Sequence, residues 1–298
     1  MFQNNTKLYF ANYFLVFAVL TYPLLYFAYK YNLPKQNSTD IYHYLSMYIT
    51  PLDFSVADGP FVYRQISAIF VKIVTNLGIY YDATISFSDP VFTQKIYFAA
   101  IFVNWLSLVF SAAVLSAYYL EKTTTPFAVI IAGLPSLVLF FQYGIIFHGL
   151  SESTDGLSVC LSVLCFVAYS EKRIYLFTLL IFLSVFQREL ILVMFTFLSL
   201  YDLFRVYLIK RAFDRQLILL FVVSFLGCIL YLMVRKFIFP DLTGTHDNQF
   251  SIYTSWEYIW ESGKTSSGRV IPDWNIDSFK QVVLTQNLSI LMLALFCK

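Results

Sequence analysis

Residues 8–29 read LYFANYFLVFAVLTYPLLYFAY and contain no charged side chain. At about 1.5 Å per residue, a helix of this length spans the roughly 30 Å hydrocarbon core of a bilayer. No small-x-small cleavage pattern follows the run, as it would after a removable secretory signal. We therefore predict that these residues form the first membrane-spanning helix.

The rest of the chain repeats this pattern. Further apolar segments lie at residues 96–120, 126–147, 157–169, 175–186, 190–204 and 217–234, and a last one begins near residue 284 and stops at Lys298. Three of these, at 157–169 and on either side of residues 187–189, are short for a full crossing. Such lengths indicate tilted or half-depth helices packed within a bundle. Because the final run stops before a comfortable span is complete, we expect either a naturally short chain or a piece of a longer one.

The composition agrees with a bilayer as the solvent. Apolar residues make up 59% of the sequence and charged residues 13%, where a soluble domain has about a quarter charged. A soluble protein of this kind could not cover its exterior with polar groups. We predict an all-α membrane protein, a polytopic bundle of about 7–9 transmembrane helices in a single domain over residues 1–298.

Two further features of the composition exclude other classes. The net charge of +2, without a basic cluster interleaved with aromatics, argues against a nucleic-acid partner. The four cysteines lie inside apolar runs without the paired spacing of a zinc or redox site. The sequence also lacks the glycine-rich phosphate loop, the zinc-protease motif and the serine-hydrolase elbow.

Lysines and arginines in short loops predict the orientation of the chain. The densest basic loop covers residues 205–215, and lesser ones lie at 121–122 and 171–173. Placing all three in the cytoplasm puts the N-terminus there as well. We expect a multi-pass protein of the inner (plasma) membrane whose outer face carries the segments at about 30–95, 148–155, 187–189 and 235–283. These hold nearly all the acidic residues and all three histidines.

The first outer loop holds the strongest candidate for chemistry. Asp40 lies just beyond the first span, where partial desolvation raises its basicity, so it could take a proton from a sugar hydroxyl or hold a divalent cation such as Mg²⁺ or Mn²⁺. Arg64 offers a planar fork to a phosphate. The alternatives are that Asp40 caps the helix after it and that Arg64 reaches to lipid headgroups.

The same loop predicts an amphipathic helix. Apolar residues recur at i, i+3 and i+4 between Ile66 and Leu77, with Arg64, Lys72 and Asn76 opposite. Such a helix is suited to lying in the membrane interface.

Two other segments carry charge on the predicted outer side. Glu152 and Asp155 would share a face if their turn is helical and could orient a substrate hydroxyl, although a capping box or a plain turn is the alternative. Arg188 and Glu189 lie between two short apolar runs, and charges at membrane depth normally face a cavity or each other. Since neighbours on a helix do not face each other, we expect one to meet Asp40, Glu152 or a substrate phosphate. A structural clamp between helices is the alternative.

The Asp in the first outer loop, the Pro-Phe-x-Tyr-Arg element at residues 60–64 and the many-helix bundle resemble the bacterial GT-C membrane glycosyltransferases. The likeness is greatest to the polyprenyl-phosphate-sugar-dependent branch, which builds or decorates cell-surface polysaccharides of the cell envelope. This resemblance implies that Asp40 is the catalytic carboxylate and that Arg64 engages the lipid-linked phosphate.

The expected function is therefore transfer of a sugar from a polyprenyl-phosphate donor to a glycan or lipid acceptor. Arg188 would join Arg64 at the donor phosphate, and the tryptophans of the last outer loop would stack on the acceptor or anchor the loop. The other predicted substrate contacts are Tyr42, His43, Tyr63, Glu152, Asp155 and Glu189. A transporter or flippase of lipid-linked saccharides and a non-catalytic subunit of a polysaccharide-synthesis complex are the rival interpretations.

Overall fold

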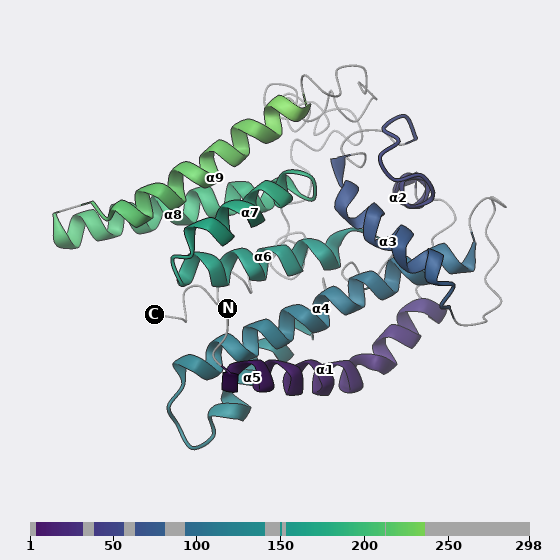
Figure 1. Ribbon diagram of the computed structural model, residues 1–298, viewed down its shortest axis with the longest axis horizontal. Helices are drawn as coiled ribbons and strands as arrows, with labels where there is room; N and C mark the ends of the chain where they lie inside the picture. The colour runs from purple at the N-terminus through teal and green to yellow at the C-terminus, as the bar shows by residue number, and fades with distance from the viewer. Residues whose placement is uncertain are drawn as a thin grey trace, which may run out of the picture.

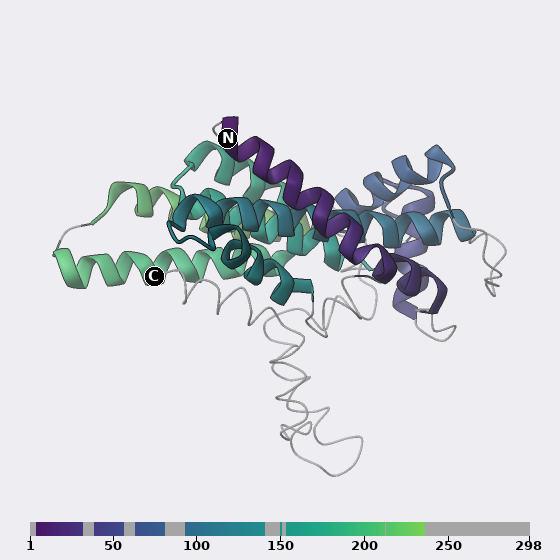
Figure 2. The ribbon, with the colours of Figure 1, turned by 90° about the horizontal axis from the view of Figure 1, so that it is seen from below.

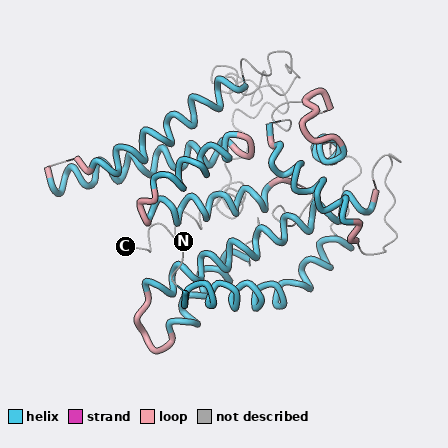
Figure 3. The backbone as a smooth tube through the Cα atoms, viewed as in Figure 1, coloured by secondary structure: helices cyan, strands magenta, loops and turns pink. Residues whose placement is uncertain are grey.

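The structure is a computed structural model that describes residues 4–31, 39–56, 63–80, 93–140, 150, 153–211 and 213–235. The side chains of residues 4–6, 31 and 39–42 fall outside this description. So do the predicted last outer loop after Arg235 and the apolar run from residue 284. The described elements are helices joined by loops, with no strand among them (Figure 3). The all-α prediction is confirmed for this part of the chain.

The helices follow the apolar runs of the sequence closely. Their bounds are α1 Asn4–Tyr31, α2 Thr39–Ile49, α3 Gln65–Leu77, α4 Gln94–Lys122, α5 Ala128–Phe140, α6 Asp155–Ser170, α7 Ile174–Val185, α8 Glu189–Lys210 and α9 Arg215–Met233. Within the described ranges, α1, α4, α8 and α9 are long and apolar enough to cross a membrane, while α3, α5, α6 and α7 are shorter apolar helices.

Helix α4 lies at the centre of the packing. It contacts α1 and α5 on one side and α3 and α6 on the other, and its apolar stretch is 83% buried. Beyond α6 come α7, α8 and α9, which pack against one another (Figure 1). Helix α1 runs obliquely across the others (Figure 2).

Hydroxyl groups join neighbouring helices inside the bundle. Ser136 of α5 donates a hydrogen bond to the carbonyl oxygen of Ala112 in α4, at 2.8 Å. The indole N–H of Trp105 in α4 donates to Thr21 of α1, at 2.9 Å. Small polar residues of this kind hold helices together where lipid tails surround them, because water is not there to compete.

The outer faces of the bundle are apolar. Among the large exposed side chains are Val19 at 73%, Ile130 at 67% and Phe197 at 66% exposed, on α1, α5 and α8. Soluble monomers rarely expose large contiguous apolar surfaces. Together with the long apolar helices, these exposed apolar faces indicate a protein embedded in a membrane.

The predicted inner loops meet at one end of the bundle. Lys122, at the end of α4, pairs with Glu171 after α6 at 2.8 Å. Lys172 pairs with Asp214, just before α9, at 2.6 Å. The N-terminal half of α1 lies towards this end too, because Phe10 packs on Phe110 while Tyr29 packs on Tyr97 at the other. The loops that the charge pattern assigns to one side of the membrane are therefore neighbours in space.

The hairpin of α6 and α7 is short. Helix α6 has 16 residues and α7 has 12, which correspond to about 24 Å and 18 Å of rise. The expectation of short helices on either side of residues 187–189 is confirmed for α7 and is wrong for α8, whose 22 residues form a full-length helix.

Helix α3 lies where the amphipathic helix is predicted, and Gly78 ends it in the left-handed conformation (φ 70°). Its place in the membrane interface stays a prediction. Its side towards the protein carries small and polar residues, Gln65, Ser67, Ala68 and Val71. Its apolar residues Phe70, Ile73 and Leu77 are about half exposed or more. Part of the apolar face therefore points away from the bundle, while Val74 packs against the core and Ile66 lines a pocket.

Candidate functional site

Gln187 joins three separate segments of the chain at the end of the bundle opposite the ion-paired loops. It lies in the turn between α7 and α8 and is 1% exposed. Its side-chain amide donates to the Ser67 hydroxyl of α3 at 2.8 Å, to the Thr154 carbonyl before α6 at 3.0 Å and to the Ser158 hydroxyl at 3.2 Å. Its own oxygen accepts from the Ser67 backbone N–H at 3.2 Å. Gln187 thereby fixes α3, the start of α6 and the α7–α8 turn relative to one another.

The next residue along the chain, Arg188, forms an ion pair with Asp155. Asp155 is the first residue of α6, and its carboxylate also accepts a hydrogen bond from the Ser153 hydroxyl at 3.2 Å. The side chains of Arg188 and Asp155 are 26% and 25% exposed. The pair is thus only partly shielded from its surroundings, and a ligand could reach it.

Asn104 of α4 holds the start of α6 in place. Its amide donates to the Ser153 carbonyl oxygen, and its oxygen accepts from the Leu157 backbone N–H at 3.3 Å. Gly156 lies between these contacts, and a Cβ built there would come within 2.7 Å of the Asn104 Cα. Because glycine has no side chain, α6 can approach α4 closely at residue 156. This close approach fixes the position of the neighbouring Asp155.

Arg64 enters the site from α3. It is 8% exposed, and its guanidinium donates a hydrogen bond to the Tyr44 hydroxyl of α2. Two further hydrogen bonds connect α3 with α2 and the loop after it. The Leu52 backbone N–H donates to the Gln65 side-chain oxygen at 2.8 Å, and Lys72 donates to the Ile49 carbonyl oxygen at 2.7 Å. Arg64 is therefore a buried part of the fold, and the alternative that it reaches out to lipid headgroups is wrong.

The charges of these residues act on one another. The positive charge of Arg64 repels that of Arg188, while the negative charge of Glu189, at the start of α8, attracts it. Two cations and the carboxylate of Asp155 thus gather where α2, α3, α6 and the α7–α8 turn meet. An anion that bound here would relieve the repulsion between the two guanidinium groups.

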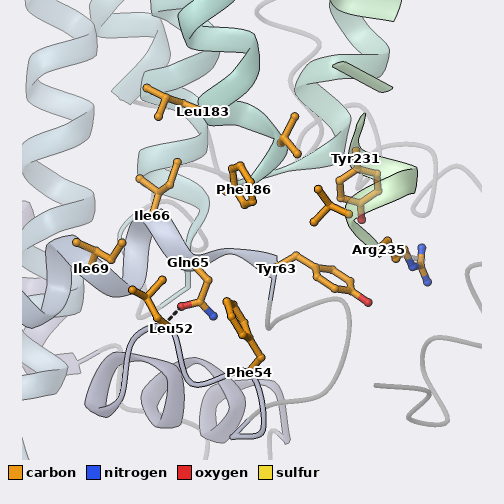
Figure 4. A pocket seen from close by; sticks show the side chains of 12 residues that line it. Leu52, Phe54, Tyr63, Gln65, Ile66, Ile69, Leu183, Phe186, Tyr231 and Arg235 are labelled. Atoms are coloured by element: carbon orange, nitrogen blue, oxygen red, sulfur yellow. Dashed lines mark hydrogen bonds between the residues drawn. The ribbon is translucent and has the colours of Figure 1, made fainter. Parts of the chain in front are cut away.

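An apolar pocket of about 240 Å³ lies beside this cluster. Its walls come from the α2–α3 loop, the start of α3, the end of α7 and the end of α9 (Figure 4). Tyr63, Gln65 and Phe186 line it, so residues next to Arg64 and Gln187 in the chain form its wall. Arg235 at its rim lies over the ring of Tyr63, 6.0 Å from the ring centre.

The structure brings together some of the predicted residues and gives one an unexpected partner. Arg64 and Arg188 lie in one region and their charges act on each other, and the ion partner of Arg188 among the described side chains is Asp155. Whether Asp40, Glu152 or a phosphate also meets Arg188 stays a prediction. Asp155 had been predicted as a substrate contact or a plain turn.

The remaining predicted residues are spread around this region. Tyr63 lines the pocket, His43 is half-buried on α2, and Asp40 belongs to the first turn of α2. The side chains of Asp40 and Tyr42, and Glu152 as a whole, lie outside the described residues. A metal ion stays a prediction: within the described ranges, no three His, Cys, Asp or Glu side chains are grouped as they would be around one.

Sequence reasoning missed Gln187, Asn104 and Tyr44. Gln187 was seen only as part of a polar break, and Asn104 lies in the middle of an apolar run. A single amide within a long apolar helix is the signal that could have identified Asn104, because such a group needs a partner inside the membrane.

Over the residues that the structure describes, the fold and the site define a helical, membrane-embedded protein in which Arg64, Arg188 and Asp155 lie at one end of the bundle. Family models, curated proteins and solved structures give no match to the chain.

Proposed function

We propose that the chain is a membrane glycosyltransferase that moves a sugar from a polyprenyl-phosphate donor to a glycan or lipid acceptor at the outer face of the inner membrane. The proposal is supported by the Gln187–Ser67 hydrogen bond, which joins segments 120 residues apart in the chain and brings Arg188 and Arg64 into one region, where their charges repel each other. Tyr44, which holds Arg64, lies one helical turn after Asp40 in α2. A cation pair for a phosphate and the helix that carries the proposed base therefore adjoin.

In this proposal the end of the bundle with Lys122, Glu171, Lys172 and Asp214 faces the cytoplasm, together with the N-terminus. The seven helices α1 and α4 to α9, with the apolar run from residue 284, would then make up the expected 7–9 crossings, and α3 would lie near the outer interface. Measured from the 171–173 turn, α6 and α7 rise by about 24 Å and 18 Å, less than the roughly 30 Å of hydrocarbon. The Asp155–Arg188 pair would lie below the outer edge of the hydrocarbon, where a lipid-linked phosphate can arrive from the side.

The chemistry requires one bond to form and one to break. The acceptor hydroxyl oxygen attacks the anomeric carbon of the sugar and forms the new glycosidic bond, while its proton passes to the Asp40 carboxylate. The bond between the anomeric carbon and the phosphate oxygen breaks, and its electron pair leaves with polyprenyl phosphate. Arg64 and Arg188 stabilise the charge that develops on this phosphate, which is where we expect most of the rate enhancement. His43, Tyr63 and Glu189 are available to orient the sugar.

The test uses the purified full chain in lipid nanodiscs with a panel of polyprenyl-phosphate hexoses and pentoses and a membrane glycolipid extract as acceptor. We expect release of polyprenyl phosphate with at least one donor, and its loss in Asp40→Asn. Asp53→Asn is the matched control, because Asp53 is an exposed carboxylate that follows the same helix and bonds only locally to Ser55 among the described contacts.

Two results would count against the proposal. If Asp40→Asn turns over as fast as the unchanged chain, Asp40 is not the base. If no donor is cleaved but lipid-linked sugar crosses the bilayer of sealed vesicles that contain the protein, the transporter interpretation holds instead.

A further inference from the structure

The pocket beside the charged cluster has the shape and lining of a site for part of a hydrocarbon chain. Its volume of about 240 Å³ is below the range of about 300–1,000 Å³ that is usual for small-molecule sites. Most of the wall is apolar and includes Leu52, Ile66, Leu183 and Phe186, and Gln65 is already bound to the Leu52 backbone. Such a pocket recognises an apolar segment and leaves the rest of the ligand outside.

The pocket is continuous with an exposed apolar surface on α3. Ile69 lines the pocket and is 38% exposed, and the neighbouring Phe70 and Ile73 on α3 are 48% and 53% exposed. A chain that fills the pocket could leave it past Ile69 and continue along α3 into the bilayer. The ligand is therefore a membrane amphiphile rather than a water-soluble molecule.

The pocket surface itself is almost wholly apolar, and two polar groups lie at its end away from Ile69. Figure 4 shows the Tyr63 hydroxyl and the Arg235 guanidinium pointing the same way, on the side away from Ile69. The rings of Tyr63 and Tyr231 both line the pocket and meet edge to face, with their centres 6.3 Å apart. A guanidinium beside phenol groups suits a phosphate, because it offers a fork of donors as well as a charge.

We propose that this pocket binds the first part of the hydrocarbon chain of a phosphate-bearing membrane lipid, with the phosphate at Arg235 and Tyr63. The site is separate from Arg64 and Arg188, and it does not depend on the proposed transferase. Two sources share this chemistry, a polyprenyl phosphate and a glycerophospholipid of the bilayer, and the test distinguishes them.

The experiment measures lipid binding to the purified full chain in detergent by native mass spectrometry, with no sugar or acceptor present. The probes are undecaprenyl phosphate, phosphatidylglycerol, and the neutral lipids undecaprenol and diacylglycerol. Ile66→Trp fills the pocket, and Ile130→Trp, on the exposed face of α5, adds the same ring elsewhere. Arg235→Gln removes the charge at the rim while leaving the apolar wall intact.

We expect one or both phosphate lipids to bind at least tenfold more tightly than their neutral counterparts, without displacement by millimolar inorganic phosphate. Ile66→Trp should abolish this binding and Arg235→Gln should remove the preference for phosphate, while Ile130→Trp changes neither. The tighter of the two phosphate lipids identifies the source.

Equal binding of neutral and phosphate lipids, or unchanged binding in a folded Ile66→Trp or in Arg235→Gln, would overturn the proposal. Should Ile66→Trp not fold, Arg235→Gln decides alone, because it lies at the rim of the pocket. If the lipids bind but no sugar is transferred, the lipid site is supported and only the proposed transferase activity is contradicted.

Discussion

Asp155 at the start of α6 pairs with Arg188 at the start of α8, and Gln187 beside Arg188 bonds to the Thr154 carbonyl beside Asp155. Two consecutive residues of one segment thus meet two consecutive residues of the other. The Asp155–Arg188 ion pair and the hydrogen bonds of the Gln187 amide therefore both hold the start of α6 against the α7–α8 turn. A substitution can test each of these interactions separately.

Asp155→Asn should destabilise the protein by about 1–3 kcal/mol, less than a fully buried pair would lose, because both side chains are about a quarter exposed. The loss arises because Arg188 keeps its charge in a partly buried place. In Asp155→Leu/Arg188→Leu no charge is left unpaired, so much of the stability should return. Reversible unfolding in mixed micelles gives the double-mutant cycle, and a double variant less stable than both single leucine variants would contradict this account.

Gln187→Leu should cost about 2–3 kcal/mol, because the Ser67 N–H and the Thr154 carbonyl would lose buried partners. Gln216→Leu is the matched control, since Gln216 is exposed at the start of α9. Thermal unfolding followed by circular dichroism compares the two. Equal small losses in both variants would mean that Gln187 does not hold the segments together.

Gly156→Ala should destabilise the protein by about 1–3 kcal/mol, because its Cβ would come within 2.7 Å of the Asn104 backbone, which cannot rotate away. It should also displace Asp155 from Arg188. Gly133→Ala is the matched control: its nearest neighbour, Tyr13, lies 3.9 Å away, and alanine gains up to about 1 kcal/mol over glycine inside a helix. The same melting temperature in both variants would show that α6 and α4 are less closely packed than described.

Asp214 should make stability depend on acid pH. The hydrogen bond from Lys172 lowers the pKa of the Asp214 carboxyl below its ordinary value. A group with a lowered pKa in the folded state stabilises the protein above the unfolded pKa, and this contribution is lost as the pH falls through the folded pKa. Asp214→Asn should remove this part of the pH dependence while its oxygen can still accept from the Gln216 N–H, as Asp214 does at 2.9 Å.

The measurement for Asp214 is the melting temperature between pH 7 and pH 3. The difference between the unchanged chain and Asp214→Asn should be largest near pH 7 and shrink towards pH 3. A difference that stays constant over this range would assign the effect of the substitution to helix capping alone.

The helices could be predicted from the sequence because burial in a bilayer and an apolar run are nearly the same property. Residues 8–29 and 217–234 contain no charge, and the structure places α1 and α9 over them. The amphipathic spacing between Ile66 and Leu77 likewise predicted α3. Spacing alone could not show which of its residues point away from the bundle, because that depends on how α2 and α4 pack against it.

The contacts of the site were less predictable. A charge at membrane depth must find a partner, so Arg188 could be identified, but which carboxylate it meets depends on how far α6 extends. Gln187 gives no signal of its own in the sequence, since an amide serves equally well in a loop and as a buried link. Its importance arises only when Ser67 and Thr154 are brought to it by the packing of α3 and α6.

Helix α7 ends after 12 residues with Leu179 and Phe182 about half exposed, so a lipid tail beside it meets a step where the helix stops. A bilayer relieves such a mismatch by thinning locally or by recruiting shorter tails. In the proposed orientation the dent would form in one leaflet only, next to the phosphate-lipid pocket. Lipids with shorter tails would then be enriched next to α7. The tail length of the surrounding lipids would therefore affect how readily a long-chain carrier lipid reaches the bundle.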